Sequence, residues 1–203
     1  MKHSLNSVYF ISVILALITL LSACDVASPE NVTASGRVKI NLRFESSSKI
    51  NIESKDYLYA QARDFKVFHG ENYADVFQNP NQFLEYTDSI VTFNLLGAAL
   101  KDSVLQVAYG SVPPITYDSL LFQIAPSEFI RLEGNRYPLT TNYNNLIIDN
   151  NFTKVIRIKD KIRVEENKTT TINIHLKVED IVFRVLDDFV FSATVDTFYI
   201  LND

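Results

Sequence analysis

The sequence predicts an all-β fold, a single antiparallel β-sandwich with Greek-key connections and about seven to nine strands. Apolar and polar residues alternate with a period of two over much of the chain, as in strands with one face on a core and one in water. These stretches are short, are separated by turn residues, and are rich in valine, isoleucine, threonine and aromatic residues. Helical periodicity is nearly absent, which argues against the helical fold classes.

The first two predicted strands show this alternation most directly. In residues 38–45 the odd-numbered positions are polar and the even-numbered positions are apolar. Successive side chains of a strand point to opposite faces, so the apolar positions should share one buried face. They are Val38, Ile40, Leu42 and Phe44. The same argument predicts a strand over residues 57–68.

Further strands are predicted in the middle of the chain, at residues 90–95, 115–124, 129–133 and 154–159. Pro113 and Pro114 should precede their strand, because proline cannot donate a hydrogen bond to a sheet. Two pieces, residues 73–86 and 96–107, are expected to hold a turn or two of helix between strands.

A β-hairpin is predicted towards the C-terminus. Residues 162–165 and the alternating run 170–179 flank a short polar turn at residues 166–168. A last strand is expected over residues 189–201, after a turn at Asp187 and Asp188.

The start of the chain has the order of an export signal. Lys2 and His3 form a short basic start, and an apolar run of 14 residues extends from Val8 to Leu21. A helix that crosses a bilayer needs about 20 residues, whereas a signal peptide carries about 7–15. The run is therefore predicted to belong to a signal peptide.

The residues at the end of the apolar run are Leu21, Ser22, Ala23 and Cys24. An aliphatic residue, two small residues and a cysteine resemble the lipobox of bacterial lipoproteins. The resemblance implies cleavage before Cys24, a thioether-linked diacylglycerol on its sulfur and an N-acyl chain. Each buried methylene contributes about 0.8 kcal/mol to membrane binding, so two or more acyl chains hold a protein stably on the membrane. Cys24 is the only cysteine, so it has no intramolecular disulfide partner. The alternatives are a secretory signal with an incidental cysteine and an uncleaved anchor.

Three parts of the chain are therefore expected. Residues 1–23 are the signal peptide, residues 24–35 the lipidated cysteine with a flexible tether, and residues 36–203 one β-sandwich domain. The expected location is the cell envelope, facing the periplasm from the inner or outer membrane. Asp25 resembles the inner-membrane retention signal of enteric bacteria, which other phyla do not follow, so surface exposure stays open.

The mature chain is acidic. Removing residues 1–23, which contain Lys2 and no acidic residue, leaves 18 basic against 24 acidic side chains and a formal net charge of −6. This balance gives no electrostatic footprint for nucleic acid and no polybasic patch for anionic lipid. Nucleic acid is therefore not expected as a partner, and the membrane is expected to be reached through the acyl chains on Cys24.

A second resemblance covers residues 36–201. The segment 112–117, Val-Pro-Pro-Ile-Thr-Tyr, resembles the Leu-Pro-Ala-Gly-x-Tyr turn of prealbumin-like β-sandwiches. This segment and the segments 94–96, 133–139 and 164–172 follow one another along the chain in an order similar to that of a family of bacterial lipoprotein domains, the domain of unknown function 4382. The resemblance implies a prealbumin-like or immunoglobulin-like sandwich without established catalytic residues.

Two positions depart from that family's pattern. Ile115 replaces the turn glycine, so the backbone there should avoid positive φ, which β-branched residues rarely tolerate. The stretch His175-Leu176-Lys177 replaces an Asp-Phe-Asp stretch, so any ligand role of those aspartates is not carried over to this chain.

Sites for metals, cofactors and catalysis are not predicted. The mature chain has two histidines, His69 and His175, interpreted as a strand end and a solvated strand position, and no second cysteine. It lacks Gly-x-Ser-x-Gly and any glycine-rich phosphate loop. Carboxylate pairs at residues 165–166, 179–180 and 187–188 are interpreted as turn and edge charges. Residues 149–151, Asp-Asn-Asn, are interpreted as a turn, with calcium as the alternative.

Two surface features remain as candidates. Tyr57 and Tyr59 provide aromatic rings on which sugars stack. Ser89, Ser103 and Ser119 each follow an aspartate and precede an aliphatic residue, which resembles the acceptor of periplasmic O-glycosylation in Bacteroidota. Ordinary turn chemistry is the alternative for these three serines.

The function expected from these features is a non-catalytic binding or assembly module of the cell envelope, with a glycan or an envelope protein as its ligand. One alternative is a fimbrial or adhesin accessory or anchor subunit, which would need an open sheet edge. Another is a carbohydrate-active hydrolase with carboxylates from distant segments about 5–10 Å apart. The sequence does not determine the oligomeric state.

Overall fold

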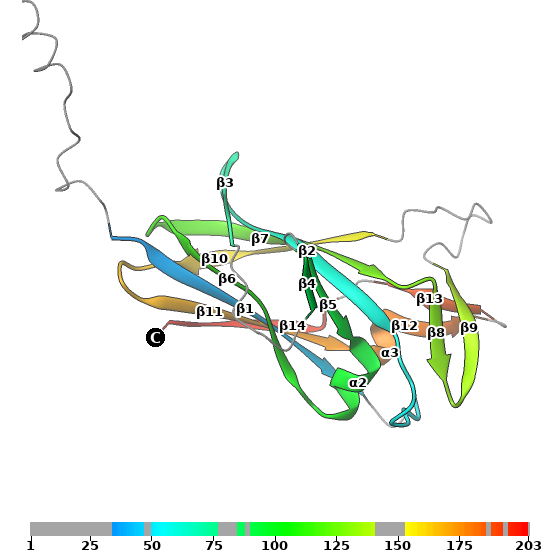
Figure 1. Ribbon diagram of the computed structural model, residues 1–203. Helices are drawn as coiled ribbons and strands as arrows, with labels where there is room; N and C mark the ends of the chain where they lie inside the picture. Colours follow the sequence, from blue (N-terminus) through cyan, green and yellow to red (C-terminus); the bar gives the residue numbers. More distant parts are fainter. Residues whose placement is uncertain are drawn as a thin grey trace, which may run out of the picture. The chain divides into compact units, whose positions relative to one another are not determined.

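The computed structural model describes residues 34–46, 50–76, 85–87, 90–140, 153–185, 188–192 and 195–202, all within one compact unit, Ala34–Asp203. These residues form fourteen strands and two short helices (Figure 1). The predicted all-β sandwich is confirmed, with more strands than the seven to nine expected. Within the described ranges, no helix is long and apolar enough to cross a membrane.

One layer of the sandwich is a four-stranded sheet. Its order is β14 (Thr197–Asn202), β11 (Thr169–Lys177), β1 (Gly36–Glu45) and β6 (Val104–Val112). β1 runs antiparallel to β6 but parallel to β11, so the sheet is mixed rather than fully antiparallel. The predicted apolar face of β1 is confirmed, because Val38, Ile40, Leu42 and Phe44 are all 0% exposed.

The second layer is a six-stranded antiparallel sheet. Its order is β10 (Lys154–Arg163), β7 (Thr116–Pro126), β2 (Tyr59–His69), β5 (Ile90–Asn94) and β4 (Glu85–Thr87), and β3 (Asn72–Asp75) also pairs with β2. The strands predicted over residues 57–68, 90–95, 115–124 and 154–159 are confirmed here. The helix expected over residues 73–86 is wrong at its described ends, where β3 and β4 lie.

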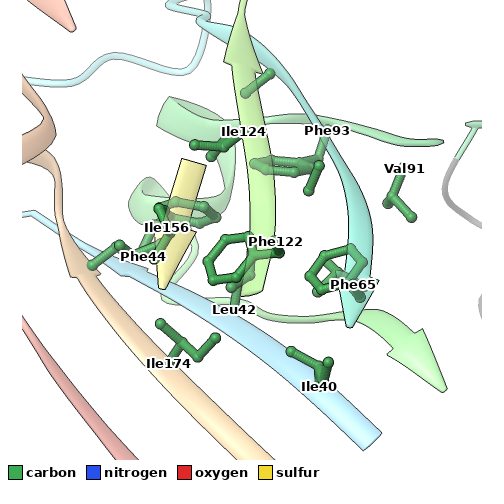
Figure 2. Packing of buried hydrophobic residues seen from close by; sticks show 14 of the residues in the cluster. Ile40, Leu42, Phe44, Phe65, Val91, Phe93, Phe122, Ile124, Ile156 and Ile174 are labelled. Carbon is green, nitrogen blue, oxygen red and sulfur yellow. The ribbon is translucent and has the colours of Figure 1, made fainter. Parts of the chain in front are cut away.

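The core lies between these two layers (Figure 2). β1 and β11 contribute aliphatic side chains such as Leu42 and Ile174, and the six-stranded sheet contributes aromatic rings. The rings of Phe65 and Phe122 stack with centroids 5.3 Å apart and an interplanar angle of 11°. Burial of this apolar surface is the main term that stabilises the sandwich, at roughly 25 cal/mol per Å².

A short helix, α2 (Leu95–Leu100), precedes β6. It begins at Asn94, whose side-chain oxygen accepts a hydrogen bond from the Gly97 N–H at 3.1 Å, a common N-cap arrangement. The helix expected over residues 96–107 is therefore present only in its first half, because β6 begins at Val104. The alternation within β6 is interrupted by a register shift against β1, which obscured the strand in the sequence.

The predicted hairpin over residues 162–179 is wrong. Its turn exists, with Asn167 at a φ of 59° and a hydrogen bond from the Lys168 N–H to the Glu165 carbonyl at 3.3 Å. However, β10 pairs with β7, whereas β11 pairs with β1 and β14 in the other sheet. The chain crosses between the layers at this turn. Alternation predicts the buried face of each strand but does not determine its partner.

A smaller four-stranded sheet contains the other strands. Its order is β12 (Val182–Val185), β13 (Asp188–Phe191), β9 (Asn135–Thr140) and β8 (Phe129–Leu132), and the helix α3 (Val178–Ile181) leads into β12. The strand predicted over residues 129–133 is confirmed as β8. The single strand expected over residues 189–201 is wrong, because β13 and β14 belong to different sheets.

The turn before β7 agrees with the expectation for Ile115. The described non-glycine residues with positive φ are Asp64, Asp102, Glu133 and Asn167, so Ile115 is not among them. Pro113 precedes the strand, and its carbonyl accepts a hydrogen bond from the Tyr117 hydroxyl at 2.9 Å. Tyr117 is 2% exposed and therefore holds this turn from inside the core.

Tyr117 should make stability depend on alkaline pH. Burial raises the pKa of Tyr117 to about 12, above its usual 10.0. Its stabilising contribution is therefore complete below pH 10 and is lost as the pH rises towards 12. At neutral pH, Tyr117→Phe should lower the free energy of unfolding by about 0.5–1.5 kcal/mol, because the hydrogen bond is lost. Between pH 10 and 12, the stability of this variant should depend less on pH than that of the unchanged protein. Urea unfolding at pH 7 and at about pH 10–11 measures both effects; equal pH slopes for the two proteins would contradict the prediction.

Candidate functional site

A groove of about 420 Å³ lies beside the smaller sheet, within the size range of ligand sites. It is built from four separate segments of the chain: the stretch after β1, the β8–β9 hairpin, the α3–β12 segment and β13. Figure 1 shows these elements together at one end of the sandwich domain. Its apolar lining includes Ile50, Leu132, Val182, Phe183, Phe189 and the ring of Tyr137.

Aromatic rings form one wall of the groove. Tyr137 of β9 and Phe189 of β13 pack with ring centroids 5.0 Å apart at an angle of 53°. The short parallel pairing of Phe189 with Leu139 brings these two strands together. Phe183 of β12 is 38% exposed, so it presents a large apolar surface to a ligand. A ligand with a flat apolar face would find both a buried and an accessible ring here.

Charged side chains give the groove its polarity. Glu133, Glu179 and Asp180 line it together with Arg184, which leaves a formal excess of negative charge. The guanidinium carbon of Arg184 lies 6.0 Å from the centroid of the Tyr137 ring. Carboxylates accept hydrogen bonds and a guanidinium donates them, so the groove offers both kinds of partner to hydroxyl groups.

Asp56 supports the turn that places Glu133. This aspartate is 2% exposed, and its carboxylate accepts hydrogen bonds from the Glu53 N–H at 2.8 Å and the Gly134 N–H at 3.5 Å. Glu133 and Gly134 both have positive φ, at 51° and 82°, as a tight turn between β8 and β9 requires. The buried carboxylate therefore connects the segment before β2 to one wall of the groove.

The residues that the structure describes contain no group of three or more His, Cys, Asp or Glu side chains suited to an ion. His69 ends β2 as interpreted, and its Nδ1 lies 2.9 Å from the Thr116 carbonyl. His175 contacts the Glu45 carboxylate at 3.2 Å, and its side chain is 15% exposed, so it is more covered than a solvated position.

The carboxylate pairs have different environments. Glu165 contacts Lys168 and Arg163, and the hydrogen bond and charge of Lys168 hold the pKa of Glu165 below its usual value. This agrees with its interpretation as a turn charge. Glu179 and Asp180 instead belong to α3 and line the groove. Residues 149–151 and Asp187 lie outside the described part of the chain.

Two of the residues predicted as modification sites lie in the described part of the chain. The lipobox residues Leu21, Ser22, Ala23 and Cys24, and also Ser89, lie outside the described residues. Ser103 is half-buried between α2 and β6, and its N–H donates to the Ala98 carbonyl at 2.9 Å. Ser119 is 3% exposed within β7, so the folded domain covers this hydroxyl. Glycosylation at Ser119 would have to precede folding.

The aspartates of these triplets have structural partners. Asp102 forms a two-point contact with the Arg43 guanidinium at 2.6 and 2.8 Å, and the Arg43 hydrogen bond lowers the pKa of Asp102. Asp118 accepts a hydrogen bond from the Gly70 N–H at 2.8 Å, which is the main cause of its lowered pKa. Asp102 thus lies in the turn after α2, whereas Asp118 lies within β7, which pairs with strands on both sides.

The tyrosine pair predicted for sugar stacking lies at the start of β2. The rings of Tyr57 and Tyr59 are 5.3 Å apart at an angle of 40°, so each covers part of the other. Tyr59 is 49% exposed, and Tyr57 is half-buried. The pair offers less open ring surface than the sequence suggested.

The residues of the groove were missed as a site by the sequence analysis. Tyr137 and Glu133 belong to a segment noted only for a family resemblance, and Phe189 was expected only as a strand residue. Phe183 and Arg184 lie between the predicted strands and were not singled out. These residues lie on segments that are far apart in the sequence. They meet only because β9 and β13 pair. The adjacent carboxylates at residues 179–180 were the one signal within a single segment.

Comparison with known proteins gives no family assignment. No protein-family model matches the sequence, and no curated protein matches it. Among solved structures, one described as a "putative cell adhesion protein" from Bacteroides eggerthii is similar over 82% of this chain, at 12% identity and a TM-score of 0.34. The chain spans 55% of the length of that protein. A likeness at this level carries no argument about function.

Proposed function

We propose that this protein is a lipid-anchored, non-catalytic binding module of the bacterial cell envelope that holds a glycan in the groove. The observation that supports this proposal is the combination of aromatic rings with carboxylates and a guanidinium in one concave site. Sugar rings present C–H faces to aromatic side chains and hydroxyls to charged side chains. The excess of negative charge favours a neutral or amino sugar over an acidic one.

The proposed location at the membrane rests on the sequence. The lipobox resemblance at residues 21–24 implies acyl chains on Cys24, which would fix the module to the inner or outer membrane. Residues 25–35 would act as the tether between the lipid and the domain. Intact-mass analysis of the native protein tests this part, because a mass without acyl groups on Cys24 would contradict it.

Glycan binding should depend on the exposed ring of Phe183. In a glycan-array screen of the full chain in detergent, we expect retention of neutral oligosaccharides. Phe183→Ala should weaken the binding of the best oligosaccharide by about tenfold, which corresponds to roughly 1.4 kcal/mol. Val155→Ala is the matched control, since Val155 is 60% exposed on β10 and does not line the groove. Calorimetric titration measures both variants.

Several outcomes would contradict this function. A folded chain that retains no glycan, or an equal loss with Val155→Ala, would remove the groove as a glycan site. If the protein released reducing ends from an oligosaccharide, and if Glu133→Gln or Glu179→Gln abolished this release, the hydrolase alternative would be favoured. Cross-linking of an envelope protein through the groove would replace the glycan by a protein ligand.

One observation favours the alternative of a fimbrial or adhesin subunit. Within the described strands, β14 and β6 end one sheet, so each has a side without a strand partner. Such edges accept a strand from another chain. Concentration-dependent assembly of the purified chain would favour this alternative.

A further inference from the structure

A cluster of two cations and two aromatic rings lies on the outer face of the six-stranded sheet. We call Lys66, Phe68, Tyr73 and Arg157 the cation–aromatic patch. The rings of Phe68 and Tyr73 lie 5.7 Å apart at an angle of 43°. The Lys66 Nζ lies 4.4 Å from the Tyr73 ring centroid, and the Arg157 guanidinium carbon lies 4.8 Å from the Phe68 ring centroid. All four side chains are thus connected through ring contacts.

A β-bulge in β2 directs these side chains outward. Ala60 and Ala62 face the core before the bulge, whereas Phe65 and Val67 face it afterwards. The extra residue is marked by a register shift against β7 between Arg63 and Lys66 and by the positive φ of Asp64, 55°. An extra residue reverses which positions of a strand are buried. Without it, Lys66 and Phe68 would point into the core.

Strand pairing then assembles the patch. Leu121 of β7 lies opposite Lys66 on one side and Arg157 of β10 on the other, so both cations share the outer face. Phe68 lies directly opposite Tyr73 in the pairing of β2 with β3. Tyr73 is 54% exposed, and this leaves much of its surface accessible.

The edge strand that contributes Arg157 is basic, although the whole chain is acidic. The chain has a formal net charge of −5, but β10 contains five basic residues and one acidic residue among its ten. Basic residues on an edge strand often prevent pairing with another chain, which accounts for part of this pattern. Lys66 lies on β2 in the interior of the sheet, where that role does not apply. Two carboxylates lie near these cations: Asp75, at 4.0 Å from the Lys66 Nζ, and Asp118, whose pKa the charge of Arg157 helps to lower.

We propose that the cation–aromatic patch binds an acidic sugar unit of an anionic polysaccharide. The guanidinium of Arg157 and the ammonium of Lys66 would donate hydrogen bonds to the sugar carboxylate, and the ring of Tyr73 would stack on the sugar. This site is separate from the groove, because none of its four residues lines the groove.

The test uses the full chain and an oligogalacturonate of defined length, with the methyl-esterified oligosaccharide as the neutral probe. Calorimetry should show binding of the acid and at least about tenfold weaker binding of the ester, because the ester cannot accept charge-assisted hydrogen bonds in the same way. Arg157→Gln and Tyr73→Ala should each reduce the affinity for the acid by about tenfold. Phe183→Ala should leave it unchanged, which separates this site from the groove.

The charge-matched control is Lys101→Gln, since Lys101 is exposed at the end of α2 and lies on none of the strands that form the patch. Circular dichroism confirms that each variant is folded, and Lys66→Gln gives a second variant of the patch. Equal losses with Lys101→Gln, or no loss with Tyr73→Ala, would overturn the proposal in favour of non-specific charge attraction. Equal binding of the ester would overturn the role of the carboxylate. Binding only to vesicles of anionic lipid would replace the polysaccharide by a membrane surface.

Discussion

Replacing Phe122 by alanine should lower the free energy of unfolding by about 3–5 kcal/mol. The Phe122 ring is 0% exposed and stacks on Phe65 within the core. It belongs to β7, which pairs on both sides with β2 and β10, so the surrounding backbone has little freedom to close the cavity. Domains are typically stable by only about 5–15 kcal/mol, so this loss is a large share of the total.

Urea unfolding monitored by circular dichroism measures this loss. Phe183→Ala is the matched control because it makes the same chemical change at a ring that is 38% exposed, where we expect a cost under about 1 kcal/mol. Equal costs for the two variants would contradict the placement of Phe122 in the core.

Replacing Asp56 by alanine should destabilise the protein by about 2–3 kcal/mol and weaken ligand binding in the groove. Two backbone N–H groups, those of Glu53 and Gly134, would lose the buried carboxylate that accepts their hydrogen bonds. Buried donors without an acceptor cost more than the hydrogen bond itself contributes. Since Gly134 follows Glu133 in the β8–β9 turn, the loss should also displace one wall of the groove.

The effect of Asp56→Ala should be compared with Glu166→Ala, which removes an exposed carboxylate from the turn between β10 and β11. The control should change the free energy of unfolding by less than about 0.5 kcal/mol. Asp56→Asn should recover part of the stability, because its amide oxygen can accept one of the two hydrogen bonds. If Asp56→Ala were as stable as the control, the hydrogen bonds that connect the segment before β2 to the groove would not contribute to stability.

The groove and the cation–aromatic patch both depend on features that sequence reasoning does not resolve. Tyr137 and Phe189 meet through a parallel pairing between strands about 50 residues apart, which no local pattern reports. Lys66 and Phe68 lie within a strand whose alternation changes at Asp64, and only the pairing with β7 shows that a bulge is the cause. A single strand pattern would place these two side chains on the wrong face.

The sequence by itself determined the all-β class, the buried face of β1, and the absence of positive φ at Ile115. Each of these depends on local geometry, because the side-chain period of a strand and the steric limits on a β-branched residue act within a few neighbouring positions. Only the tertiary structure decided that β10 and β11 lie in different sheets, that β13 and β14 are separate strands, and that four segments form a groove. These depend on which strands pair, and pairing is settled by the packing of the whole core rather than by any one segment.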